Sequence, residues 1–247
     1  MELKPRLSRG ANAIQTSRGW RLTIPAGPAN RYRLSQIDDH LHIARRNYPY
    51  LPSVTLSLRA RVSSDSIPGT WGLGLWNDPF GFSFAPGEGF FHLPALPNAI
   101  WFFNASPQNY LSFRDDKPAQ GFLAQAFRAP PFHPLLIFAG AALPFSRKRT
   151  RRLLSRVIEE DGVQLSLDVT QWHEYRLDWG PERVIFEADN VKVLETSVSP
   201  HVPLGIVIWI DNQYAAFTPE GKLGFGLLEG REGWLEIENL EIKRSPK

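Results

Sequence analysis

The alternation of apolar and polar residues predicts short β-strands along much of this chain. In residues 53–62 (SVTLSLRARV), every second side chain from Val54 to Val62 is apolar, and serine, threonine and arginine stand between them. This period of two places one face of a strand in a core and leaves the other face polar. Shorter alternating segments at residues 20–24, 31–34 and 40–44 predict further strands.

Residues 171–190 (QWHEYRLDWGPERVIFEADN) predict a β-hairpin. Residues 172–178 and 183–187 are rich in aromatic and β-branched side chains, and the Gly-Pro pair between them is a strong turn signal. Two antiparallel strands joined by a tight turn are the simplest structure that satisfies both patterns.

The spelling of this hairpin resembles one family. The aromatic residue Trp172 is followed by His173, then by Tyr175 and Trp179 in the same strand, and the second strand ends at an Asp-Asn turn. The arrangement is similar to the C-terminal half of glycoside hydrolase family 16, the laminarinases and lichenases. Residues 204–209 (LGIVIW) and 233–242 (GWLEIENLEI) look like later strands of that family. The resemblance implies an all-β, concanavalin A-like jelly-roll sandwich of two curved antiparallel sheets.

The catalytic signature of that family is missing. The family carries Glu-x-Asp-x-Glu, or a version with one more residue before the last Glu, on the strand that corresponds here to residues 98–104 (NAIWFFN). Retaining hydrolysis needs two carboxyls about 5–5.5 Å apart. The motif positions hold Ala99, Trp101 and Asn104, or in the shifted register Asn98, Ile100 and Phe103. We therefore expect the family's glycosidase activity to be absent.

Aromatic residues stand where the acids are expected, which predicts an aromatic cleft. Trp209 falls where the family places a sugar-stacking tryptophan, and the resemblance implies that Trp101 lies near it. Gly72 and Gly74 share a strand face with Trp76, so they predict a shelf for a flat ligand or a space filled by a neighbouring ring. Packing of the indoles into the core is the other interpretation. The expected ligand-binding residues are Trp76, Trp101, Asn104, Trp209, Asp211 and Tyr214.

Two aspartates are candidates for an altered chemistry. Asp211 points to the same side of a strand as Trp209, so it is the best candidate for a general base or for accepting a ligand hydroxyl. Asp78, just after Trp76, is the second candidate. Aspartates also begin turns for purely local reasons.

Residues 134–158 predict an inserted helical arm. An apolar run to residue 145 is followed by a basic segment, and the leucines, valine and isoleucine of residues 153–158 recur at helical spacing. The arm could be a membrane anchor, a lid whose basic side receives an anion, or a helix packed on the sandwich with a solvated basic side. The expected anion or membrane contacts are Arg147, Lys148, Arg149, Arg151 and Arg152.

Length, charge and composition give the remaining expectations. The 247 residues form one expected sandwich domain over 1–247. The net charge of +3 and the short basic segment do not favour a nucleic-acid partner. Without cysteine there is no disulfide, and the six scattered histidines predict no metal site; no cofactor motif is present. No signal-peptide or transmembrane pattern is evident, so we expect a cytoplasmic protein that is either free or peripherally bound to a membrane.

Three hypotheses follow from the sequence. The first is a non-hydrolytic, glucanase-like protein that binds a carbohydrate or a glycosylated molecule in an aromatic cleft. The second is an enzyme of altered chemistry that acts on a hydrophobic small molecule in the same cleft. The third is a membrane-associated structural module.

Overall fold

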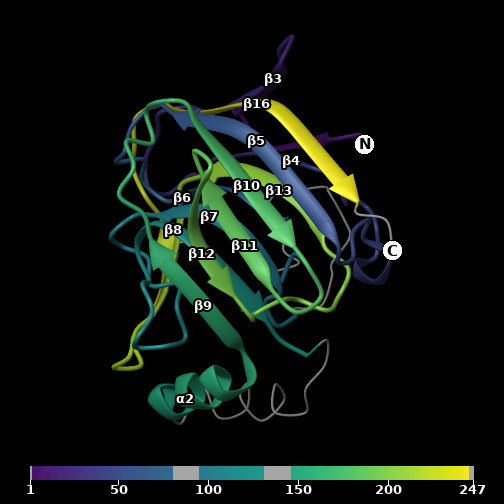
Figure 1. Ribbon diagram of the computed structural model, residues 1–247. Coiled ribbons are helices and arrows are strands. Elements are labelled where there is room, and N and C mark those ends of the chain that lie inside the picture. The colour runs from purple at the N-terminus through teal and green to yellow at the C-terminus, as the bar shows by residue number, and fades with distance from the viewer. Residues whose placement is uncertain (1, 80–94, 131–145, 245–247) are drawn as a thin grey trace.

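The computed structural model describes residues 2–79, 95–130 and 146–244 as two antiparallel seven-stranded sheets packed face to face (Figure 1). Sheet A contains, in spatial order, β1 (Lys4–Leu7), β4 (Leu34–Asp38), β13 (Gly205–Asp211), β6 (Thr70–Trp76), β7 (Ala99–Ala105), β8 (Gly121–Arg128) and β9 (Glu159–Gln164). Sheet B contains β12 (Val191–Thr196), β11 (Val184–Ala188), β10 (His173–Trp179), β5 (Val54–Val62), β16 (Gly233–Arg244), β3 (Gly19–Ile24) and β2 (Asn12–Gln15). The predicted jelly-roll sandwich is confirmed.

Three smaller elements accompany the sheets. A separate ribbon is formed by β14 (Gln213–Phe217) and β15 (Leu223–Leu227), and a short 3₁₀ helix, η1, spans Arg45–Asn47. The helix α2 (Arg147–Val157) contains the basic segment and lies beside β9, outside the two sheets (Figure 1). The apolar part of the predicted arm, residues 134–145, lies outside the described residues. No helix in the described part of the chain is long and apolar enough to span a bilayer.

The main core lies between the sheets and is built from the alternating residues. On β5 every second residue from Val54 is buried, while the residues between them are only partly covered. Trp71, Leu73 and Leu75 of β6 meet this row from sheet A. The predicted hairpin is also confirmed, because Tyr175–Trp179 of β10 pairs antiparallel with Val184–Ala188 of β11.

The predicted strands at residues 31–34 and 40–44 are wrong. The strand in this region is β4, and His42 adopts a left-handed backbone conformation with φ of 67° in the loop that follows it. The polar residues of β4 concealed the strand in the sequence. Gln36 and Asp38 are buried on the sheet and hydrogen-bond to each other, and Arg6 of β1 lies 3.7 Å from the Asp38 carboxylate.

Sheet A also has a buried outer face, directed away from the main core. We call it the tryptophan face; its aromatic members are Trp76 of β6, Trp101 and Phe103 of β7, Phe127 of β8 and Trp209 of β13. Every residue of β7 and of β13 is buried, so these strands are covered on both sides. From α2 and its end, Leu154, Val157 and Ile158 pack into the same cluster. The basic segment therefore forms a helix packed on the outside of the sandwich.

Candidate ligand-binding face

Three indole rings meet on the tryptophan face. The ring centroids of Trp101 and Trp209 are 5.6 Å apart, and Trp76 lies 6.1 Å from Trp209 and 6.2 Å from Trp101. The planes of Trp76 and Trp209 differ by only 7°. The cluster forms because β13, β6 and β7 are neighbours in sheet A, and each strand directs one tryptophan outward.

The two glycines of β6 make room for these rings. A Cβ atom on Gly72 would lie 2.6 Å from the Trp209 ring and 2.7 Å from the Cβ of Phe103. A Cβ atom on Gly74 would lie 2.6 Å from the Cα of Trp101. The predicted shelf is therefore filled by neighbouring aromatic side chains, which was the alternative interpretation of these glycines.

The three indoles differ in accessibility. Trp101 and Trp209 each expose 8% of their surface, whereas Trp76 is half-buried. Trp76 is therefore the most accessible of the three rings.

The indole N–H of Trp209 begins a chain of hydrogen bonds that ends on a buried acid. Trp209 Nε1 donates to Thr70 Oγ1 over 2.9 Å, and that hydroxyl donates to Asp211 Oδ1 over 3.0 Å. The backbone N–H groups of Thr70 and Gln213 donate to the same carboxylate oxygen. The hydroxyl of Thr70, itself held by Asp211, therefore fixes the position of the Trp209 ring.

Asp211 is the most perturbed acid on this face. Burial raises the pKa of Asp211 to about 7, although the hydrogen bonds from Thr70 and Gln213 act to lower it. Burial, and then the Asp211 charge, raise the pKa of Tyr32, which packs against the same aromatic cluster. A carboxyl that titrates near neutral pH can exchange a proton with a bound molecule.

Trp101 has an equivalent arrangement that sequence reasoning missed. Its Nε1 donates to Gln125 Oε1 over 3.4 Å, and Gln125 Nε2 donates to Glu160 Oε1 over 2.9 Å. The backbone N–H of Phe113 donates to the other oxygen of Glu160, and burial raises the pKa of this carboxyl. In the sequence, Glu160 stands in the acidic run Glu159–Asp161, which by its composition is typical of a solvated turn or a cap. It is instead a buried residue of β9 on the tryptophan face.

Trp76 is held by a histidine. Its Nε1 donates to His40 Nε2 over 3.0 Å, so in the neutral imidazole the hydrogen is on Nδ1. That nitrogen lies 3.6 Å from Asp39 and 3.9 Å from Asp38. A Cβ atom on Gly205 would overlap the His40 ring at 2.4 Å. All three indole N–H groups of the cluster are therefore bonded inside the protein, and what a ligand can contact is ring surface.

The carboxylates that the strands of sheet A place on this face are far apart. Asp38 pairs with Val207, and Asp211 pairs with Leu34, so the two acids stand four residues apart along adjacent strands. That offset corresponds to about 13 Å at the usual rise of a strand. Glu160 belongs to β9, four strands from β13, which at the usual strand spacing is about 19 Å away. None of these three pairs has the separation of a retaining pair.

Two expected ligand-binding residues, Asn104 and Tyr214, do not belong to the tryptophan cluster. Asn104 shares its face of β7 with Ile100 and Phe102, which belong to the main core, and it pairs with Trp71 and Phe122 of the neighbouring strands. The expectation that it joins the indoles is corrected, because β7 has no bulge to turn it outward. Tyr214 belongs to the β14–β15 ribbon, where its ring lies against Gly224 and Gly226.

The second candidate acid, Asp78, has a local backbone role. It adopts a left-handed conformation with φ of 47° just after β6, and its carbonyl oxygen accepts a hydrogen bond from Arg45. Within the described residues, no group of three histidine, cysteine, aspartate or glutamate side chains could hold a metal ion.

The basic residues of α2 divide into two kinds. Arg151 is buried and fastens the helix, donating to the carbonyl oxygens of Phe217 and Ser112 and pairing with Asp115. The other expected contacts are exposed: Arg147, Lys148, Arg149 and Arg152.

Comparison with known proteins bears on the fold. No protein-family model matches the sequence, and no curated protein sequence matches it. Solved structures do match. The β-glucanase of Bacillus licheniformis aligns with a TM-score of 0.52 at 12% identity, over 99% of this chain and 92% of that chain.

Two further glucan-related structures agree. A LamA variant from Zobellia galactanivorans, in complex with laminaritriose and laminaritetraose, gives 0.52 at 13% identity over 95% and 82% of the two chains. A family 16 endo-glucanase from Bacteroides ovatus, in complex with G4G3G-2F-DNP, gives 0.50 at 12% identity over 98% and 94%. This chain has the glucanase fold. At such identities the glucanase fold is what the comparison establishes.

Proposed function

We propose that this protein binds a carbohydrate on the tryptophan face without cutting it. The observation that carries the proposal is the outward side of β7, where Ala99 and Trp101 occupy two positions at which the resemblance to family 16 expects acids, with Phe103 and Ala105 beside them. Trp76 and Trp209 stand beside this strand, so an aromatic cluster occupies the region.

The geometry of the indoles suits a sugar. Indole rings offer large apolar faces, and their N–H groups usually find a partner when buried. Here the partners are Thr70, Gln125 and His40, so the rings are fixed before any ligand arrives. A preformed aromatic surface loses little conformational freedom on binding, which favours affinity. Trp76, the most accessible ring of the three, is the expected stacking platform.

Among the described residues, the acids that sheet A places on this face do not form the pair that hydrolysis needs. A retaining glycosidase needs two carboxyls about 5–5.5 Å apart, and an inverting enzyme needs about 6.5–9.5 Å. The strand pairing separates Asp38, Asp211 and Glu160 by more than either distance. We therefore propose binding as the function.

Titration calorimetry with laminari-oligosaccharides and mixed-linkage gluco-oligosaccharides tests the proposal. Trp76→Ala should weaken binding by about tenfold, the loss of one stacking contact. Trp209→Phe, which keeps a ring but loses the N–H bond to Thr70, should weaken it less. Trp234→Ala is the matched control, because this indole lies on sheet B under the guanidinium of Arg21. Affinity that falls equally in all three variants, or in none, would exclude the tryptophan face. Release of reducing ends from the same glucans by the wild type would exclude the non-hydrolytic part.

Asp211 favours a second function, an enzyme that acts on a hydrophobic small molecule at the same face. Its carboxyl has a pKa of about 7 and lies in the same aromatic environment as Tyr32, which suits a general base at neutral pH. Native mass spectrometry of the purified protein tests this function. A retained apolar molecule that is chemically altered by the wild type but not by Asp211→Asn would establish it, and unaltered substrate in both would exclude it.

A further inference from the structure

A pocket beside α2 is lined by four basic side chains, Arg114, Lys148, Arg151 and Arg152, and by two acidic ones, Asp115 and Asp116. It has a volume of about 260 Å³ and lies between the helix and residues 113–116, with Pro219 at its side. Lys148, Arg152 and Ser155 line it from α2. These positions are spaced by four and three residues, so they share one face of the helix.

The acids of the pocket already have partners. Asp116 receives two hydrogen bonds of 2.8 Å from Arg114, and these bonds lower the pKa of its carboxyl. Asp115 pairs with the buried Arg151. Lys148 and Arg152 make no ion pair with any residue that the structure describes. The charge of Glu220 acts on Lys148 without a close pair, so neither Lys148 nor Arg152 is tied to a carboxylate of the described residues.

The position of these cations within the helix adds to the imbalance. The first turn of α2 contains Arg147, Lys148 and Arg149 and no acidic residue. The N-terminus of a helix carries a partial positive charge, which disfavours cations there. An anion bound between Lys148 and Arg152 would relieve this repulsion. The sequence itself offers no local reason for such a cluster.

The pocket adjoins the proposed carbohydrate surface. Phe113 lines the pocket and also packs against Phe127, with ring centroids 6.5 Å apart, and Phe127 packs against Trp101 at 6.1 Å. One chain of aromatic contacts thus connects the pocket to the three indoles. A ligand that stacks on the tryptophans could place a charged substituent in the pocket.

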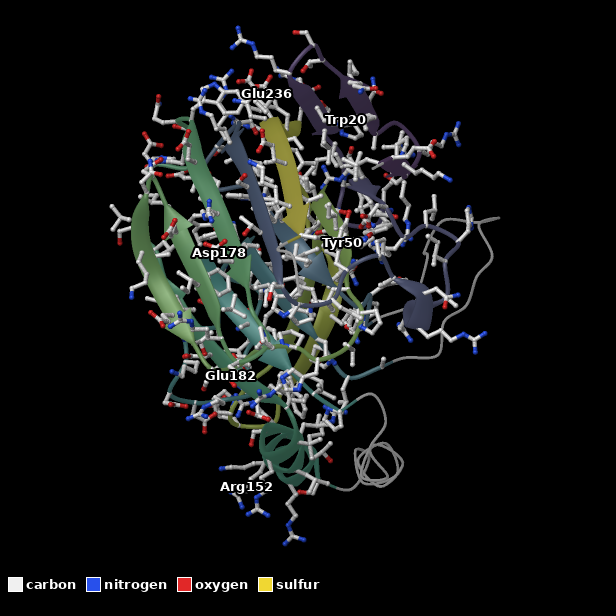
Figure 2. The ribbon with its side chains drawn as sticks, turned by 45° about the vertical axis from the view of Figure 1, so that its right-hand side comes forward. Trp20, Tyr50, Arg152, Asp178, Glu182 and Glu236 are labelled. Atoms are coloured by element: carbon white, nitrogen blue, oxygen red, sulfur yellow. The ribbon has the colours of Figure 1, made fainter. Side chains whose placement is uncertain are left out.

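A membrane surface fits α2 less well than an acidic sugar does. The exposed residues of the helix are all basic: Arg147, Lys148, Arg149, Arg152 and Arg156. Its Leu154 and Val157 pack against the sandwich. Insertion into a bilayer needs an apolar face directed outward, and these residues do not provide one. Figure 2 shows Arg152 on the outer part of the helix, away from the sheets.

We propose that the pocket is an anion subsite for an acidic carbohydrate, with Lys148 and Arg152 binding a sulfate or carboxylate group of the chain. The inference rests on the proposed carbohydrate function and specifies its ligand class. Arg151 is excluded from direct binding, because its guanidinium is used to hold the helix. The pocket is smaller than most ligand sites, which suits one charged group and the ring that bears it.

Calorimetry with a laminari-oligosaccharide and its sulfated form, at low salt, tests the subsite. The sulfated form should bind the wild type about tenfold more tightly, the size of one charge-assisted contact. Lys148→Ala/Arg152→Ala should abolish that advantage and leave the neutral oligosaccharide unaffected. Arg149→Ala/Arg156→Ala removes the same charge from positions outside the pocket and should keep most of the advantage.

The outcomes separate the two proposals. Equal affinity of the wild type for both forms, or an equal loss in both double variants, would overturn the subsite and leave the carbohydrate function standing. Loss of neutral binding in Trp76→Ala supports the tryptophan face independently of α2. If phosphatidylserine vesicles bind through Lys148 and Arg152 while the sulfated oligosaccharide neither binds nor competes, the helix recognises a membrane and the acidic-carbohydrate subsite is overturned.

Discussion

The outer faces of the two sheets both carry tryptophan, but the surroundings of the indole rings differ between them. On sheet A, Trp101 and Trp209 are buried, face other indoles, and donate to Gln125 and Thr70. On sheet B, Trp234 is half-buried beneath the guanidinium groups of Arg21 and Arg61, at 4.5 and 5.4 Å.

The sheet B tryptophans are part of a charged surface. Arg61 also lies 4.8 Å from Trp172, and Arg21 and Arg61 both pair with Glu236, which Figure 2 labels on β16. Cations over a ring occupy the face that a sugar would use. A tryptophan on the outer face of a sheet therefore does not by itself indicate a ligand site. Side chains from the neighbouring strands decide whether the face of the indole is free or already in contact with a cation.

The largest expected contrast between the faces is in stability. Trp209→Ala should lower the free energy of unfolding by about 3–5 kcal/mol, because it leaves a cavity in a packed cluster. Trp234→Ala should cost about 1 kcal/mol, since it loses cation–π contacts at a solvated site. Urea unfolding followed by circular dichroism measures both losses. Similar values for the two variants would mean that the tryptophan face is no better packed than the surface of sheet B.

The pH dependence of stability provides a second test of sheet A. The pKa of Asp211 is about 7 in the folded protein and about 3.9 in an unfolded chain. The folded state therefore holds the proton more tightly between these values, and stability falls as the pH rises from about 4 to 7, by roughly 4 kcal/mol. Asp211→Asn removes this contribution. The difference between variant and wild type should grow in favour of the variant over that range, and a constant difference would contradict the burial of this acid.

A smaller effect is expected where the rings approach the backbone. Gly72→Ala adds a Cβ that would overlap Trp209 and Phe103, and such overpacking costs about 1–3 kcal/mol. Gly233→Ala is the matched control, because its nearest neighbour would be 3.5 Å away at ordinary contact distance. The midpoint of thermal unfolding distinguishes them. If the loss at Gly72 is no larger than the loss at Gly233, then the rings of the tryptophan face can shift to accept the extra atom.

The smallest effect belongs to the charged network of sheet B. Arg61→Gln breaks the pair with Glu236 and the contacts with Trp172 and Trp234. Because these groups are partly solvated, the cost should be below about 1 kcal/mol. It should disappear in 1 M salt, where charges are screened within about 3 Å. The loss in Trp209→Ala should persist in the same salt, and parallel behaviour of the two variants would contradict the comparison.

The sequence determined which segments become strands wherever one face had to be apolar. Alternation located β5, and β3 at residues 20–24, because burying every second residue of an extended chain requires that period. The hairpin of β10 and β11 was equally evident, since its turn chemistry is local. The strands of sheet A that are covered on both faces carry a weaker local signal. Residues 34–38 of β4 do not alternate between apolar and polar, and the acidic residues of β9 do not mark an apolar face, so neither strand was predicted.

Only the tertiary structure decided the site. Asn104 and Trp101 lie three residues apart, and the unbulged pairing of β7 directs them to opposite faces. Glu160 became a buried partner of Gln125 because β9 pairs with β8, a relation between distant segments that no local pattern encodes. The glycines of β6 predicted that a side chain or a ligand approaches the backbone there. The strand order of sheet A determined that this group is the ring of Trp209 from β13. Strand order and register follow from the packing of the whole sandwich. The sequence therefore predicts where a strand lies better than it predicts which strands lie beside it.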